Sequence, residues 1–122
     1  MVEESIFAHL STVAALTTYI STRIYPMMMP ENVTLPAISY QRISNAPQYS
    51  MTGPCGLDNP RIQVDVWTTG YGVAKTIGDQ VRKAMNTATA FKAVQLSDSD
   101  MFEPDLEIYR VSIDFSCWFA ST

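Results

Sequence analysis

The chain has 122 residues, of which 47% are hydrophobic and 16% are charged, and its formal net charge is −4. This length and composition fit one domain, residues 1–122, with one hydrophobic core, and they argue against intrinsic disorder. An acidic chain lacks the basic stripe that holds nucleic acid tightly. No apolar run is long enough to span a bilayer, and the start Met1-Val2-Glu3-Glu4 is unlike a signal peptide, so we expect cytosolic synthesis and no membrane partner.

The first predicted element is an amphipathic helix over residues 3–18, in which Ile6, Leu10 and Val13 recur at helical spacing. His9 lies on this helix, and nothing near it in sequence supplies a nucleophile or a second metal ligand. We interpret it as a surface or flanking histidine.

Two extended segments follow. Residues 23–26 predict a short strand ending at Pro26, and residues 36–44 predict a longer one in which Ile43 breaks the alternation and indicates a bulge. Between them, the run Met27-Met28-Met29 could form a pliable binding surface, although we favour core filling under a loop.

Residues 45–60 contain three prolines and two glycines without periodicity, which predicts a long loop between two strands. The apolar side chains of Tyr49, Met51 and Leu57 favour a partner-docking arm over a passive loop. Cys55 in this segment and Cys117 in the last strand lack a CxxC spacing, and we expect both to be free thiols.

Residues 61–69 alternate, which predicts a strand with Ile62, Val64 and Val66 toward the core. The segment 72–88 predicts a helix with an apolar stripe, in which small residues allow close packing; the stripe comprises Val73, Ala74, Ile77, Gly78, Val81, Ala84 and Met85.

Residues 91–96 predict a further strand, and 97–105 an acidic, solvated turn without the spacing of a calcium loop. The longest alternating segment, 107–119, predicts a central strand with Val111, Ile113 and Phe115 on its core face.

The two best strands carry matching outward residues: Arg61, Asp65 and Trp67 on one, and Arg110, Asp114 and Trp118 on the other. If the strands pair antiparallel, each arginine can approach an aspartate of the other strand and stabilise the sheet. Alternatively, this face is an assembly surface, because tryptophan and arginine are enriched at interface hot spots. The aspartates make an unconvincing active site, and no nucleophile, phosphate-loop or metal motif occurs, so we expect no enzyme, no cofactor and no metal.

The order of these elements resembles the tail completion (tail terminator, head-tail joining) proteins of long-tailed bacteriophages and prophages. The resemblance covers nearly the whole chain and rests on short segments in a fixed order: Arg23-Ile24-Tyr25-Pro26, Leu35–Tyr40, Arg61–Trp67, Val81–Met85 and Tyr109–Phe115.

The resemblance implies an α+β subunit with two helices packed on a mainly antiparallel sheet, in the order α-β-β-β-α-β-β. It also implies a non-enzymatic virion protein that forms a ring, in relatives commonly a hexamer. Such a ring ends the tail tube and meets the head connector, and DNA passes through its lumen without specific binding. We expect an acidic lumen to let DNA slide. The alternative is a small ligand-binding or enzymatic α+β domain that uses the Arg/Asp/Trp face.

Overall fold

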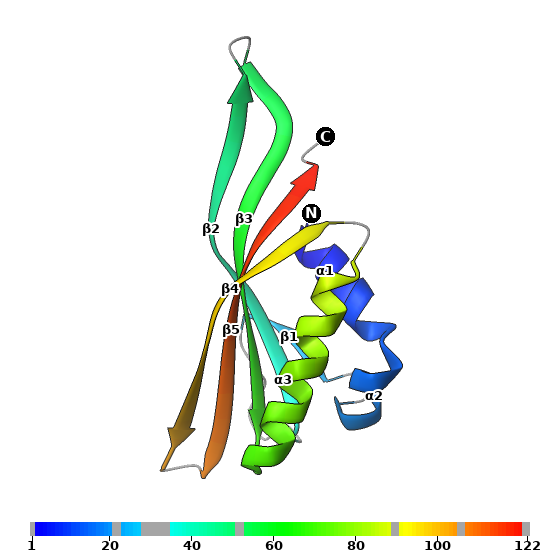
Figure 1. The fold of residues 1–122 in the computed structure, drawn as a ribbon, viewed down its shortest axis with the longest axis vertical. Helices are drawn as coiled ribbons and strands as arrows, with labels where there is room; N and C mark the ends of the chain where they lie inside the picture. Colours follow the sequence, from blue (N-terminus) through cyan, green and yellow to red (C-terminus); the bar gives the residue numbers. More distant parts are fainter. Residues whose placement is uncertain are drawn as a thin grey trace.

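The computed structural model describes residues 2–20, 23–27, 35–50, 53–88, 91–104 and 107–120. Its elements follow in the order α1 (Val2–Ser11), α2 (Ala14–Ile20), β1 (Ile24–Pro26), β2 (Ala37–Ser50), β3 (Gly53–Thr68), α3 (Tyr71–Asn86), β4 (Lys92–Glu103) and β5 (Ile108–Ala120). The strands form one sheet in the order β1-β2-β3-β5-β4, antiparallel except for the β1–β2 pair. The helices lie on one side of the sheet (Figure 1), so the α+β prediction is confirmed.

The core forms where α3 crosses β3 and β5. The predicted core faces of both strands are fully or almost fully buried, with Ile62, Val64, Val66, Val111, Ile113 and Phe115 each at most 2% exposed. From α3, the buried residues are Ala74, Ile77, Gly78, Val81, Ala84 and Met85. The predicted stripe is therefore confirmed except for Val73, which is 41% exposed.

The predicted helix over 3–18 is two helices, α1 and α2, so the described residues hold three helices where two were predicted. The break comes at Thr12 and Val13, whose amides donate to the carbonyls of His9 and Leu10, three residues back. This tighter turn redirects the chain, and it lets the apolar residues of both helices, Ile6, Leu10, Leu16 and Ile20, reach the core. In the described part of the chain, every helix is too short or too polar to cross a membrane.

The predicted loop at 45–60 is wrong, because β2 and β3 continue through most of it as a long hairpin. Its register pairs Asn45 with Pro60 and Ser50 with Gly53. A register shift between Pro47 and Tyr49 places an irregularity beside a proline, where the missing N–H is tolerated.

The same hairpin accommodates Pro60, which lies in β3 between Asp58, in register with Phe119 of β5, and Arg61, in register with Ser116. Proline has no N–H to offer across the ladder. The side-chain amide of Asn59 instead donates to the Cys117 carbonyl oxygen at 2.6 Å, and also to Ser116 Oγ at 2.9 Å. The prolines therefore predicted a loop, whereas in the structure the side chain of Asn59 supplies the missing donor and the strand continues.

The acidic turn predicted at 97–105 is also wrong for most of its length, because β4 runs to Glu103. The bulge expected near Ile43 is confirmed by a register shift between Arg42 and Ser44. A second shift, between Gln95 and Ser97, changes the phase of β4, so that Asp98 and Asp100 pair with the core-facing Ile113 and Val111 of β5. Both aspartates therefore lie on the helix side of the sheet.

Gly78 lies where α3 packs closely on the sheet. A methyl group there would lie 3.4 Å from Val111 Cγ1 and 3.9 Å from Ile113 Cδ1, at the limit of ordinary contact. Alanine is preferred over glycine in a helix by about 1 kcal/mol. We expect Gly78→Ala to change the free energy of unfolding by less than about 1 kcal/mol, whereas Gly78→Leu should lower it clearly by overpacking. Urea unfolding of the two variants checks this, and equal stability would contradict the close contact.

Candidate functional site

The outward face of β3 and β5 carries the cross-strand ion pairs that the sequence predicted. Arg61 Nη2 lies 3.0 Å from Asp114 Oδ2, and Arg110 Nη2 lies 3.2 Å from Asp65 Oδ2. The antiparallel register brings Gln63 opposite Asp114. Arg61, two residues before Gln63 and on the same face of β3, therefore reaches Asp114 diagonally. The structure therefore confirms the structural interpretation of these four charged residues.

The two tryptophans of this face have different environments. Trp67 lies under the guanidinium of Arg110, 4.8 Å from ring centroid to Cζ, and its Nε1 donates to Ser39 Oγ at 2.9 Å. Trp118 lies in register with Lys92 at the opposite end of β5 and is 38% exposed. The structure thus separates Trp118 from the cluster with which it was grouped.

Burial divides the ion pairs into an inner and an outer pair. Asp65 is only 5% exposed and also accepts hydrogen bonds from Gln63 Nε2, whereas the side chain of Arg61 is 48% exposed. The buried Arg110 Nε has no hydrogen-bond acceptor among the described residues. The inner pair is therefore already occupied within the subunit, and only the Arg61–Asp114 pair is accessible to a neighbour.

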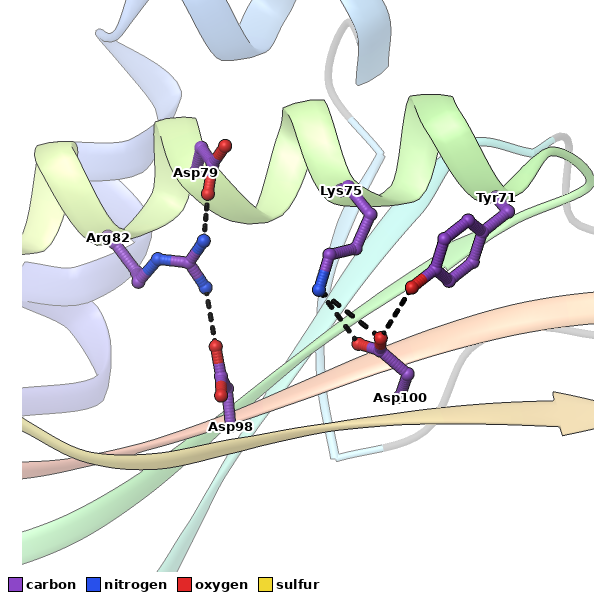
Figure 2. A network of polar contacts seen from close by, with 6 residues as sticks. All are labelled: Tyr71, Lys75, Asp79, Arg82, Asp98 and Asp100. Carbon is purple, nitrogen blue, oxygen red and sulfur yellow. Dashed lines mark hydrogen bonds and ion pairs between the residues drawn. The ribbon is translucent and has the colours of Figure 1, made fainter.

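A second polar network, which the sequence reasoning missed, joins α3 to β4 (Figure 2). Lys75 Nζ lies 3.2 Å from Asp100 Oδ2, and the Tyr71 hydroxyl donates to the same oxygen at 2.9 Å. Arg82 contacts Asp98 at 2.8 Å and also pairs with Asp79 on its own helix. The signal in the sequence was the alternation of acids at 98 and 100, which marks one face of a strand.

The electrostatics of Asp100 follow from these contacts. The hydrogen bond from Tyr71, supported by the ammonium of Lys75, holds the pKa of Asp100 below its ordinary value. The same bond raises the pKa of Tyr71, because the neighbouring carboxylate disfavours a phenolate. Both groups keep their ordinary ionisation at neutral pH, and the contact acts as a tether between helix and strand.

A small hollow of about 160 Å³ opens beside this tether, lined by Tyr71, Asp100, Met101, Phe102, Tyr109, Arg110 and Val111. Its aromatic rings contact one another, with centroids of Phe102 and Tyr109 4.8 Å apart. Of the Arg/Asp/Trp face, Arg110 is the residue that lines this hollow. Among the described residues, no group of three or more His, Cys, Asp or Glu side chains is arranged to hold a metal ion.

Exposed apolar side chains gather along β4, the strand at one edge of the sheet: Val94, Leu96, Met101 and Phe102 are each between 38% and 50% exposed. The sequence predicted a strand over 91–96 but gave no sign that it lay at an edge. We name this strip, Val94 to Phe102, the β4 edge.

The structure describes only some of the remaining residues that the sequence singled out. The side chains of Tyr49 and Leu57, and the whole of Met51, lie outside the part of the chain that the structure describes, as do Met28, Met29 and the Cys55 side chain. His9 Nε2 lies 2.6 Å from the Ala84 carbonyl oxygen, which links α1 to α3. Cys117 is a free, buried thiol, and burial raises its pKa to about 12.

The two ion pairs of the outward face should differ in their energetic contribution. Arg110→Met leaves the buried Asp65 carboxylate without its cation, which we expect to lower the free energy of unfolding by about 2 kcal/mol. Arg61→Met at the exposed pair is the matched control and should lower it by about 0.2–1 kcal/mol. Urea unfolding of both variants measures the difference, and equal losses would contradict the assignment of inner and outer pairs.

The α3–β4 tether should make stability depend on acid pH. Because the pKa of Asp100 is lowered in the folded state, its contribution is present above the ordinary value of 3.8 and is lost as pH falls through the lowered value. Asp100→Asn should therefore lose less than about 1 kcal/mol at neutral pH, and its stability should converge on that of the parent in acid. Tyr71→Phe should show part of the same convergence. A constant difference across pH 2–7 would be inconsistent with the tether.

The chain can be compared with curated protein sequences, with solved structures and with models of protein families. A search of curated protein sequences gives no match. Among solved structures, the chain is similar to a chain of the virion of native gene transfer agent (GTA) particle, with a TM-score of 0.79 and 16% identity, covering 97% of this chain and 93% of that one. The family model for Tail completion protein gp17 matches residues 4–120. The chain therefore belongs to the Tail completion protein gp17 family and is a structural protein of a phage tail.

Proposed function

We propose that the chain assembles into a ring, expected to be a hexamer, that ends the tail tube and joins it to the head connector. The observation that carries this proposal is the β2–β3 hairpin, which projects beyond the rest of the sheet in Figure 1. The family match and the likeness to a virion chain support a role in assembly, while the hairpin supplies a structural means of reaching a neighbour.

The hairpin projects without support from the described part of the subunit. The β3–β5 pairing ends at Leu57 with Ala120, so the ribbon beyond it has only β2 and β3. A two-stranded ribbon alone is marginally stable in water. It gains stability when one of its faces or edges packs on another surface, and in an assembled tail that surface belongs to a neighbouring molecule.

The composition of the ribbon fits such a contact. Residues 44–57 contain no Asp, Glu, Lys or Arg, although 16% of the whole chain is charged. Charged residues are depleted in the buried centre of protein interfaces. An uncharged projecting ribbon is therefore suited to protein contact and poorly suited to holding DNA phosphates.

The remaining partners follow from the family role. We propose the tail tube protein on one side of the ring, the head connector on the other, and DNA passing through the lumen without specific binding, in keeping with the net charge of −4. The protein is then made in the host cytoplasm and ends in the virion tail without catalysing a reaction. Because Asp98 and Asp100 are paired with α3, they are held against the helix and do not form the free acidic turn expected to line a lumen.

Trimming the hairpin tests the proposal. Replacing residues 47–58 by Asn-Gly joins Ala46 to Asn59, which are already register partners, with the turn preferred for short hairpins. We expect the variant to fold, because the core is retained, and to fail to form rings with purified tail tubes, as seen by light scattering and electron microscopy.

The matched control is Phe7→Ser, which changes a side chain 42% exposed on α1 and leaves the hairpin intact. The control should assemble as the parent does. Normal ring assembly by the trimmed variant, with an unchanged melting temperature, would overturn the role given to the hairpin.

A further inference from the structure

We propose that Asn59 is the residue that fixes the direction in which the β2–β3 hairpin projects, by holding a hinge at the base of the hairpin. The hinge comprises Ile43 of β2 and Pro60 of β3, where the hydrogen-bonding ladders on both sides of β3 are irregular. The inference rests on the proposed function for the role of the hairpin in assembly, because its direction decides which molecule it can reach. The hinge itself is a property of the single chain.

The first irregularity lies in β2. Arg42 pairs with Ile62 of β3. The next pair joins Ser44 to Arg61, so β2 has one residue more than β3 at this level, Ile43. Such a bulge bends its strand and increases the local twist. Ile43 is 47% exposed, so its side chain is not held in the core. The β2 strand can therefore change direction here.

The second irregularity lies on the other side of β3, at the adjoining residues. Asp58 pairs with Phe119 of β5, and Arg61 pairs with Ser116, but the register of the described residues contains no pair for the two β3 residues between them. Both strands advance by three residues here, from 58 to 61 and from 116 to 119, so nothing is inserted. What is missing is a donor, because Pro60 has no N–H. Both ladders of β3 are therefore weakened at the same level.

Asn59 replaces the missing bond with its side chain. Its Nδ2 donates to the Cys117 carbonyl oxygen at 2.6 Å and to Ser116 Oγ at 2.9 Å, and we call these two bonds the Asn59 clamp. Cys117 is fully buried, so its carbonyl oxygen depends on a donor from the protein. A primary amide carries two N–H groups on one nitrogen, which is what two acceptors on one strand require.

The Asn59 clamp lies at the boundary between the core and the projecting ribbon. On the core side, Ile62 and Phe115 pair with each other and are completely buried. On the hairpin side, the β3–β5 pairing ends at Leu57 with Ala120, two residues beyond Asn59. Figure 1 shows the hairpin and the end of β5 pointing in different directions. Among the described residues, few contacts other than the clamp therefore set the angle between the hairpin and the sheet.

Distances between two spin labels test the direction of the hairpin. Cys55 of the hairpin and Lys83→Cys, at an exposed position of α3, carry the labels, whereas Cys117 is buried. Double electron–electron resonance on the full chain should give one narrow distance distribution in the labelled parent. Asn59→Leu, which keeps a side chain of similar size and removes both donors, should broaden it. Equally narrow distributions in both chains would overturn the proposal, and so would a broad distribution in the parent.

A second substitution tests whether the clamp stands in for the donor that proline lacks. Pro60→Val restores a main-chain N–H in a residue that favours strands. The double variant Asn59→Leu/Pro60→Val should therefore recover the narrow distribution. Ser44→Ala is the matched control, because Ser44 is exposed and pairs with Arg61 at the same level of β2, and it should leave the distribution unchanged. A double variant as broad as Asn59→Leu alone would contradict the inference.

Hydrogen exchange separates loosening of the hinge from a general loss of stability. In Asn59→Leu, the backbone amides of the hairpin, residues 44–58, should exchange about 2- to 10-fold faster than in the parent, as expected for the loss of one hydrogen bond. Core amides at 62–66 of β3 and 111–115 of β5 should exchange at the rate of the parent. Equal acceleration in the hairpin and the core would overturn the positioning role. Neither measurement uses tail tubes, so failure of the parent to form rings would overturn the proposed function and leave the hinge standing.

Discussion

The packing of α3 across β3 and β5 is the contact on which the rest of the structure depends. It buries the apolar faces of both strands, and Gly78 allows the helix to approach Val111 closely. Once this face is covered by helices, the opposite face of the sheet must satisfy its own charges. It does so with two arginine–aspartate pairs and an arginine stacked on Trp67.

The same helix determines which surfaces of the sheet are available to other molecules. Lys75 and Arg82 hold Asp100 and Asp98 on the helix side, so the acidic segment is a strand tied to α3. Val94, Leu96 and Met101 of β4 remain exposed, and β5 is the one described strand that pairs with β4. The proposed ring therefore takes its contacts from the projecting hairpin, because the inner arginine–aspartate pair of the polar face is already satisfied within the subunit.

Errors in the sequence prediction have a common cause. Residues 45–60 were predicted as a loop because prolines and glycines usually interrupt strands, and residues 97–105 as a turn because acids usually mark solvent. Both segments are strand for most of their length. In the first, Asn59 supplies the donor that Pro60 lacks; in the second, basic residues of α3 neutralise the acids. Asn59 is adjacent to Pro60, but it acts on the carbonyl oxygen of Cys117 in another strand, and the basic residues lie on α3. Each compensation therefore depends on a contact between segments distant in sequence, which local propensity does not record.

The sequence by itself determined the elements with strong periodicity: the strands around Val64 and Ile113, the helix around Ile77, their burial, and the cross-strand arginine–aspartate pairs. The sequence also indicated the family, because the order of these elements along the chain resembles that of the family whose model matches residues 4–120. Only the tertiary structure decided which strand lies at an edge, which acids are neutralised and how far the hairpin projects. These properties depend on contacts between segments far apart in sequence, and neither periodicity nor composition records such contacts.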